Sequence, residues 1–154
     1  MKVRIEFEEN LNENEVIIKC SEVDNTIQKI QKAILDITSE AQRLAFIKED
    51  KEYYLSLDEI LFFETNESNV HAHTVDDVYR VKYRLYELEE VLPNNFLRVS
   101  KSTILNSKHV LSINKSLTSL NIVQFYKSHK QVYVSRQYFK LVKDKLGERR
   151  NYEK

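Results

Sequence analysis

Apolar residues alternate with charged ones at the start of this chain, in the segment KVRIEFE. Val3, Ile5 and Phe7 recur at every second position, which predicts a strand over residues 2–8 with one buried face. The segment VIIKC, residues 16–20, follows after NENE and is predicted to be the partner strand. The chain is therefore expected to begin with two paired strands.

A helix is predicted next, because apolar residues then recur at helical spacing. Ser21 is the expected N-cap, and an acidic first turn follows it. The helix is expected to run to about Arg43, with an apolar stripe formed by Ile27, Ile30, Ile34 and Ile37. Residues 1–44 thus make a predicted strand–strand–helix extension that carries more acidic than basic side chains.

Residues 45–147 have the pattern of many short strands. Two hairpins are expected, one around Asp76-Asp77 and one around KSHK, and the segment 100–107 is expected to be a turn or a single helical turn. The predicted fold class is mostly β with flanking helices (α+β). Strands are predicted at 44–49, 53–56, 60–64, 70–75, 78–83, 96–99, 110–114, 117–126 and 131–134.

Two helices are predicted within this second part of the chain. Leucines repeat at helical spacing over 85–92, and Pro93 follows, so a short helix ends there. Ser135 is expected to cap a last helix, which ends with Gly147 at the C′ position. The remaining residues, 148–154, are predicted to be a disordered tail.

The charges are unevenly distributed, although the formal net charge is zero. Residues 96–147 contain ten Lys or Arg and one acid, Asp144, for a net charge of +9. Residues 1–95 carry 11 basic and 21 acidic side chains, for a net charge of −10. Such a polarised chain indicates a half that faces a polyanion, although a solvated basic face without a partner gives the same pattern.

Gly147 is the only glycine, and this excludes several classes of enzyme. Phosphate-binding loops, dinucleotide fingerprints and nucleophile elbows need glycines at fixed offsets, because their backbone approaches a ligand closely or adopts positive φ. No other catalytic arrangement or cofactor site is recognisable, so a non-enzymatic protein is expected. His71 and His73 share one strand face, but without a third ligand they are expected to face solvent and bind no metal.

Cysteine usage and hydropathy point to the compartment. Cys20 is the only cysteine and cannot form an internal disulfide. The longest apolar run, ILFF near Ile60, is far too short to span a bilayer, and the start MKVRIEFEEN lacks the apolar centre of a secretory signal. A soluble cytoplasmic protein of a reducing compartment is expected.

Two stretches of the sequence carry a family resemblance. The first contains SLDEILFFET, a hairpin and YRLYELEEVLPNNFLRVSKSTILN, and the second is VYVSRQYFKLVKDKLG. Together they resemble the LytTR DNA-binding domain over about residues 45–147. The family patterns F-x-R-x-x-x-S-x-x-x-N and Ser-Arg are matched by Phe96, Arg98, Ser102 and Asn106 and by Ser135 and Arg136.

The resemblance implies a sequence-specific transcriptional regulator, in which small antiparallel β-sheets present loops to the major groove of double-stranded DNA. Three contact regions are implied: the loop after Glu64, the segment after Arg98, and the start of the last helix. Lys101 would reach a base edge and Ser102 a phosphate, which suits their chemistry. The predicted DNA-binding residues are Ser68, Asn69, Arg98, Lys101, Ser102, Lys115, Arg136, Gln137 and Lys140.

Some of these residues have a simpler alternative role. Arg98 is equally compatible with bracing its loop, and Asn106 is expected to fix a turn through its side chain. Tyr138 and Phe139 are expected to belong to the core, because they fall at core-like spacing.

The other basic residues are less specific signals. Lys115, Lys127 and Lys130 can supply only diffuse attraction for phosphates. The sequence also departs from the family habit, because KSHK replaces a glycine turn in the last hairpin. Gln137 stands where an Arg occurs in some relatives, which leaves the base preference at that contact open.

The partners of the extension follow from the resemblance alone. Residues 1–44 are too few for the phospho-accepting receiver of many LytTR proteins, so control by a receiver is not expected. The resemblance to free-standing regulators of this type suggests that a small membrane protein inhibits this chain. The helix over 21–43 would be the surface that binds this inhibitor, or the contact of a homodimer on repeated DNA sites. The competing class is a non-enzymatic protein-interaction or sensor module whose basic half docks an acidic partner, indifferent to duplex sequence.

Overall fold

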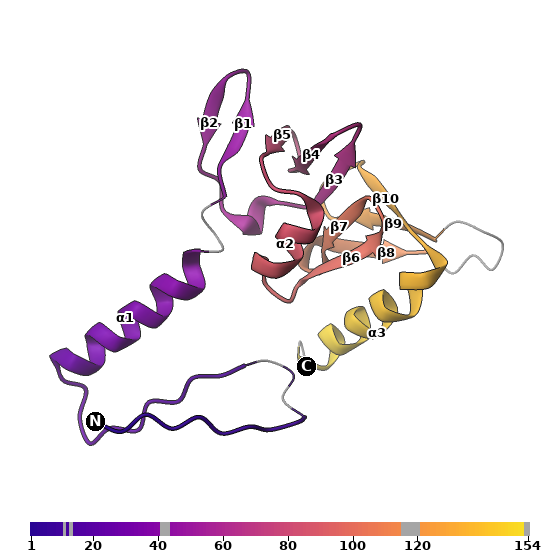
Figure 1. Ribbon diagram of the computed structural model, residues 1–154. Helices are drawn as coiled ribbons and strands as arrows, with labels where there is room; N and C mark the ends of the chain where they lie inside the picture. The colour runs from indigo at the N-terminus through magenta and orange to yellow at the C-terminus, as the bar shows by residue number, and fades with distance from the viewer. Residues whose placement is uncertain (11, 13, 41–43, 115–120, 153–154) are drawn as a thin grey trace. The chain divides into compact units, whose positions relative to one another are not determined.

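The computed structural model describes residues 1–10, 12, 14–40, 44–114 and 121–152 (Figure 1). The chain divides into two units, Met1–Ile37 and Thr38–Lys154. Among the described residues, no helix combines the length and the apolar character that crossing a membrane requires.

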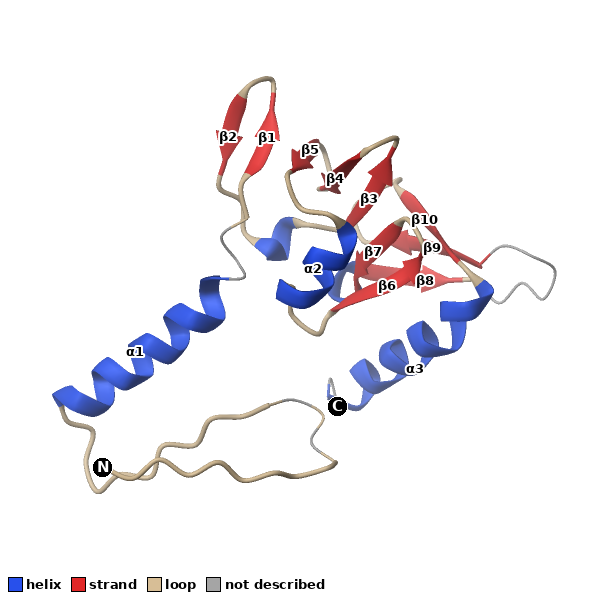
Figure 2. Ribbon diagram, in the orientation of Figure 1, coloured by secondary structure: helices blue, strands red, loops and turns tan. Residues whose placement is uncertain are grey.

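The second unit contains two antiparallel sheets (Figure 2). In the described residues the larger sheet has seven strands, in the order β2-β1-β5-β4-β3-β7-β6. The smaller sheet has three, in the order β10-β9-β8. The larger sheet is formed by β1 (Phe46–Lys48), β2 (Lys51–Tyr53), β3 (Phe62–Asn66), β4 (Asn69–His73), β5 (Val78–Val81), β6 (Phe96–Ser100) and β7 (Thr103–Asn106). The smaller sheet is formed by β8 (Val110–Ile113), β9 (Asn121–Phe125) and β10 (Gln131–Val134).

Short helical segments connect and cover these sheets. The α-helices of this unit are α2 (Leu85–Val91) and α3 (Arg136–Tyr152), and two single 3-10 turns are η1 (Leu57–Glu59) and η2 (Ser107–His109). Helix α2 lies against β3, whereas α3 and β10 both lie against β6. The predicted fold class, mostly antiparallel β with flanking helices, is confirmed.

The larger sheet is buried on both faces at its centre. Along β3, Phe63 belongs to one core with α2 and η1, and the preceding residue, Phe62, belongs to a second core with the smaller sheet and α3. Along β7, Ile104 and Leu105 divide in the same way. Because successive side chains of a strand point to opposite faces, both strands are apolar at consecutive positions.

This continuous burial explains one wrong prediction. The segment 100–107 was expected to be a turn or a helical turn, but the turn is confined to Lys101 and Ser102, and Thr103–Asn106 is strand β7. All four residues of β7 are buried. A strand that is buried on both faces has no alternation of polar and apolar residues, so a period of two does not reveal it.

The last helix is longer than predicted. Gly147 was expected at the C′ position, but it lies within α3, which continues to Tyr152. Residues 148–152 of the predicted disordered tail are therefore helical, and 153–154 lie outside the described residues. A glycine ends a helix when the backbone takes a left-handed conformation there, and Gly147 has no positive φ.

The first unit contains the helix α1 (Asn25–Glu40). The cap is Asp24 and not the predicted Ser21, because the Ile27 amide donates to Asp24 Oδ1 (2.9 Å). The strands predicted over 2–8 and 16–20 are not formed by the described residues of those segments. Their described apolar side chains, such as Val3, Phe7 and Val16, are exposed, and a two-stranded ribbon is marginal alone.

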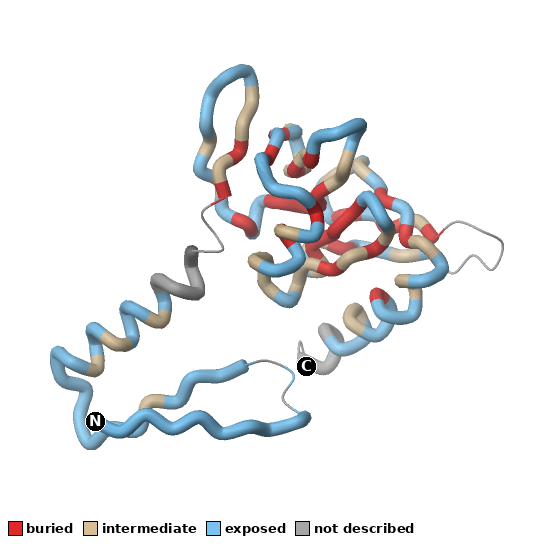
Figure 3. Tube along the Cα trace, viewed as in Figure 1, coloured by how far each residue is buried: buried red, intermediate tan, exposed pale blue. Residues whose placement is uncertain are grey.

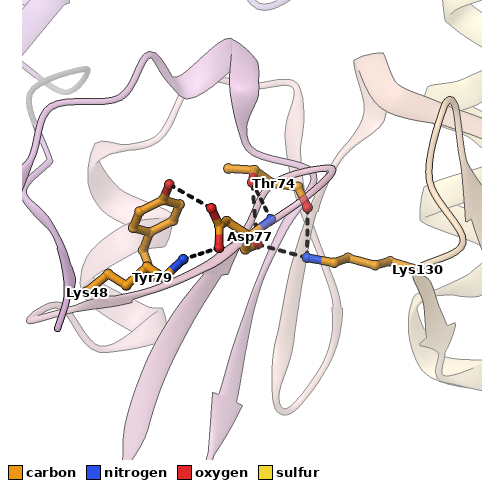
Figure 4. Close-up of polar contacts among 5 residues, drawn as sticks. All are labelled: Lys48, Thr74, Asp77, Tyr79 and Lys130. Carbon is orange, nitrogen blue, oxygen red and sulfur yellow. Dashed lines mark hydrogen bonds and ion pairs between the residues drawn. The ribbon is translucent and has the colours of Figure 1, made fainter.

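A cluster of side chains connects the turn between β9 and β10 of the smaller sheet to the turn between β4 and β5 of the larger sheet (Figure 4). Lys130, in the turn between β9 and β10, donates from Nζ to the carbonyl oxygens of Thr74 and Asp77, each at 2.8 Å. The Asp77 carboxylate in turn pairs with Lys48 and accepts from the Tyr79 hydroxyl (3.5 Å). The pKa of Asp77 is lowered, chiefly by its hydrogen bond with Lys48.

Candidate nucleic-acid interface

The turn between β3 and β4 is the first predicted contact region. Asn66 pairs with Asn69 at the end of the ladder, which leaves Glu67 and Ser68 as the two turn residues. Ser68 and Asn69, the predicted contacts, are exposed, as are Asn66 and Glu67. Glu67 has a φ of 56°, the left-handed conformation that tight turns demand and that side chains other than glycine adopt at a cost.

The turn between β6 and β7 is the second contact region. Lys101 and Ser102 form this turn and are both exposed. The Ser102 amide donates to Ser100 Oγ (3.2 Å), and the Ser102 carbonyl oxygen accepts from the Thr65 amide (2.8 Å). That last bond fastens this turn to the end of β3, so the two turns lie side by side.

Arg98 holds the second turn from inside the sheet. Its Nε donates to the Ser100 carbonyl oxygen (2.6 Å), and Nη2 donates to the carbonyl oxygen of Lys101. Nη1 also pairs with Glu89 Oε2 at 3.4 Å, which links the turn to α2. The Arg98 side chain is only 20% exposed, so in this geometry its guanidinium braces the loop.

The start of α3 is the third contact region. Strand β6 carries an extra residue, Val99, between the ladder pairs of Arg98 and Ser100. The Val99 carbonyl oxygen accepts from the Ser135 amide (2.8 Å), so the bulge attaches the residue before α3 to the end of β6. Arg136 and Gln137, in the first turn of α3, are exposed.

The three regions therefore meet at one end of the second unit. We call this the contact end and define it as residues 66–69, 100–102 and 135–137. The described residues Asn114 and Asn121 also reach it, because Asn121 pairs with Val134. Exposed polar and basic side chains at or next to this end are Asn66, Ser68, Asn69, Lys101, Ser102, Arg136, Gln137 and, one turn into α3, Lys140.

Not all predicted residues are brought together. Lys115 lies outside the described residues, between Asn114 and Asn121. Lys127 and Lys130 lie in the turn at the other end of β10. Lys130 donates to carbonyl oxygens in the turn between β4 and β5. Its ammonium therefore has a structural contact that the sequence did not suggest.

Asn106 has the structural role that was predicted for it. Its side chain is fully buried, and Oδ1 accepts from Asn95 Nδ2 (2.8 Å) and from the Lys108 amide (3.1 Å). Its Nδ2 donates to the Ile60 carbonyl oxygen (3.0 Å), so it fixes η2 against the chain before β3. Tyr138 and Phe139 pack on the second core, as predicted.

The histidines of β4 are less solvent-facing than predicted. His73 stacks on Phe62, with ring centroids 4.2 Å apart, and its side chain is 16% exposed. Burial, with added repulsion from Lys130 and His71, lowers the pKa of His73 to about 4. Among the described residues, no group of three or more His, Cys, Asp or Glu side chains is placed to hold a metal ion.

In the turn between β3 and β4, two residues were missed by sequence reasoning. Asn66 and Glu67 sit between the predicted strand and the predicted contacts Ser68 and Asn69. The turn sequence Asn-Glu-Ser-Asn offered the signal, because a two-residue turn between paired asparagines exposes all four side chains.

A short loop-bearing β framework with exposed basic and amide side chains at one end is suited to nucleic acid, and comparison with known proteins identifies the class. Residues 50–147 match the family described as the LytTr DNA-binding domain. This chain belongs to the LytTR DNA-binding domain family, as the resemblance in its sequence implied.

Relatives match nearly the whole chain. An uncharacterized HTH-type transcriptional regulator of Staphylococcus aureus strain NCTC 8325 is 30% identical over 148 residues, which cover 96% of this chain and 99% of the relative. A regulator with the same description from the bovine strain RF122 is 32% identical over 150 residues, with the same coverage. The extension is thus part of what these relatives share with this chain.

A solved structure shares the fold. A LytTr DNA-binding domain from Bacillus cereus superposes with a TM-score of 0.62 at 22% identity, over 68% of this chain and 95% of that chain. The relatives are described as helix-turn-helix proteins, but successive α-helices of the described part of this chain are separated by strands. A helix-turn-helix needs two helices joined by a short turn, so these helices do not form one.

Proposed function

We propose that this chain is a non-enzymatic transcriptional regulator that binds specific sequences of double-stranded DNA through the contact end. The observation that carries the proposal is the convergence of two turns and a helix start, which hydrogen bonds from Thr65 and Ser135 hold at one end of a rigid framework. Family membership supports DNA as the ligand. Its relatives are described as transcriptional regulators, which supports a role in transcription, and in bacteria this takes place in the cytoplasm.

The proposal gives the exposed residues different tasks. Lys101 donates to a base edge in the major groove, and Ser102 contacts a phosphate. Ser68 and Asn69 contact the neighbouring stretch of the DNA backbone. Arg136, Gln137 and Lys140 reach the DNA from the start of α3. Lys115 adds attraction for phosphates. Arg98 is a positioning residue, since its donors hold the carbonyl oxygens of Ser100 and Lys101.

Selection of binding sites from a random duplex library tests this proposal. The purified full chain should enrich a motif, and a salt titration on the best site should show the loss of affinity that phosphate contacts produce. Lys101→Ala is expected to relax the motif at one position, with a cost of about 1–3 kcal/mol for the preferred base.

A matched control separates base contacts from bulk charge. Lys108 is exposed in η2, at the opposite end of β7 from Lys101, so Lys108→Ala removes the same charge away from the contact end. Its motif should equal that of the wild type. If no motif is enriched, or both variants weaken all sequences equally, the basic half senses only charge, and docking to an acidic protein replaces this proposal.

The partners of the extension are part of the proposal as well. We expect a homodimer on repeated sites, and we carry a small membrane-protein inhibitor as a hypothesis from the family resemblance. Association of the full chain with itself and with a small membrane protein should be measured with and without the first 44 residues. Equal association of both forms would contradict a role for the extension in either contact.

A further inference from the structure

Residues 1–10 are exposed along their whole length (Figure 3). Val3, Ile5 and Phe7 are 88%, 89% and 97% exposed. Among the residues before 41 whose side chains are described, none is buried. Apolar residues at every second position share one face of an extended segment, so these three form a single stripe. An exposed apolar stripe of this kind can be covered by a second chain.

The charged residues between them form a second face with an ordered pattern. Arg4 Nε pairs with Glu6 Oε1 at 3.0 Å, which shows that the two side chains lie on the same face. Lys2 and Arg4 precede Ile5, and Glu6 and Glu8 follow it at mirrored positions. The segment is therefore complementary in charge to a reversed copy of itself.

An antiparallel pair of two such segments, centred on Ile5, satisfies both faces. Ile5 lies opposite Ile5 of the second copy, and Val3 lies opposite Phe7. On the other face Arg4 lies opposite Glu6 and Lys2 opposite Glu8. Aromatic–aliphatic and opposite-charge pairs both stabilise adjacent strands, and a pair related by a two-fold axis makes each contact twice.

The same charges disfavour one apolar-matched register of pairing within the chain. The segment 16–20 is the other candidate strand, and apolar residues match when Ile5 lies opposite Ile18 and Phe7 opposite Val16. That register places Arg4 opposite Lys19 and Glu8 opposite Glu15. Like charges directly opposite one another are destabilising, and the described residues of these segments form no ladder.

We propose that residues 2–8 pair antiparallel with the same residues of a second copy of this chain, about a two-fold axis at Ile5. The apolar stripe of α1, with Ile27, Ile30 and Ile34 only partly buried, supplies cover for the apolar face of this ribbon. The inference gives the homodimer proposed above a defined contact. It rests on residues outside the DNA-binding domain match, so its failure leaves the proposed DNA contacts intact.

A charge exchange tests the register in the full chain. Arg4→Glu makes the cross-strand pairs between positions 4 and 6 repulsive, and Glu6→Arg does the same with the opposite sign. Each variant alone should dimerise at least about tenfold more weakly than the wild type by sedimentation velocity. An equimolar mixture of the two should recover the association, because one copy then presents two acidic side chains at positions 4 and 6 and the other presents two basic ones. A wild type that stays monomeric, or a mixture no tighter than the separate variants, overturns the proposal.

Cross-linking provides an independent measure of the register. With Cys20→Ser as background, Ile5→Cys should form a disulfide between copies under mild oxidation, because facing residues of adjacent strands have close Cβ atoms. Val3→Cys is the control, since its two copies would lie about 13 Å apart, at four residues of offset. Equal cross-linking of both variants contradicts the axis at Ile5. Neither test depends on DNA, and Lys101→Ala should leave both results unchanged.

Discussion

At the scale of single residues, Asn106 matches the family pattern but stabilises the fold and does not lie at the contact end. Asn106→Ala should lower the free energy of unfolding by about 2–4 kcal/mol, because the fully buried side chain makes three hydrogen bonds and its loss leaves the buried Ile60 carbonyl oxygen without its donor. Asn95→Ala removes only one of these bonds and should cost about 1 kcal/mol. Urea unfolding measures both values. Equal losses for the two variants would mean that the bonds to Ile60 and Lys108 contribute nothing.

His73 gives the folded chain a defined sensitivity to acid. Its pKa is about 4 in the fold, against about 6.5 in an unfolded chain. Between these values the unfolded chain binds a proton that the fold does not, so stability falls as pH falls from about 6.5 to about 4 and then levels off. Glu64 Oε2 lies 3.5 Å from His73 Nε2, but burial is the largest cause of the shift and lowers the pKa.

His73→Phe should therefore lose less stability between pH 7 and pH 4.5 than the wild type, by about 1–3 kcal/mol. The range allows for the partial exposure of the ring. Unfolding curves at the two pH values measure this difference. If His73→Phe and the wild type lost the same free energy of unfolding between pH 7 and pH 4.5, His73 would not be the source of the acid sensitivity.

At the scale of elements, Glu67 in the hairpin turn between β3 and β4 is expected to affect both the stability of the fold and its affinity for DNA. Glu67→Gly should stabilise the fold by up to about 1 kcal/mol, because glycine adopts its φ of 56° freely. It should also raise DNA affinity about threefold at low salt, since a negative charge leaves the contact end. Asp50→Gly relieves a φ of 61° in the turn between β1 and β2 and should change stability alone. Equal DNA affinities for both variants would place Glu67 away from phosphate.

The elements also show which patterns a sequence reveals. Strands β4, β5 and β10 and the helix α2 follow from alternation, leucine spacing and Pro93, because each has one solvent face. Strand β7 is hidden because it is buried on both faces. The strand at 2–8 was wrongly predicted because alternation shows that a face could be buried but not that anything packs on it, and the strand at 16–20 was predicted only as its partner. Residue types predicted the contact regions, but the bracing of Arg98 and the bonds of Lys130 depend on tertiary geometry.

At the scale of the whole second unit, the two ends of the strands have different tasks. The contact end presents exposed side chains on turns that are held by backbone bonds. The opposite ends carry side chains that join one element to another, such as Asn106 between β7 and η2 and Lys130 between the two sheets. This division allows the exposed turns to vary in sequence without loss of the framework, because the bonds from Thr65 and Ser135 that hold them are made by backbone groups.

Lys130 offers a test of that division. Lys130→Met keeps most of the apolar stem but loses two charged hydrogen bonds to the turn at Thr74 and Asp77, so the free energy of unfolding should fall by about 2 kcal/mol. The variant should also raise the pKa of His73, because the repulsion from the ammonium is removed, and so reduce the stability lost on acidification.

The DNA motif selected by Lys130→Met should remain that of the wild type, because Lys130 lies at the far end of β10 from α3. Lys127→Met is the matched control in the same turn: it removes an exposed charge and should leave both stability and the titration of His73 nearly unchanged. Chemical unfolding, histidine NMR titration and site selection give the three readouts. A changed motif with unchanged stability would show instead that Lys130 contacts DNA, and that basic residues far from the contact end take part in recognition.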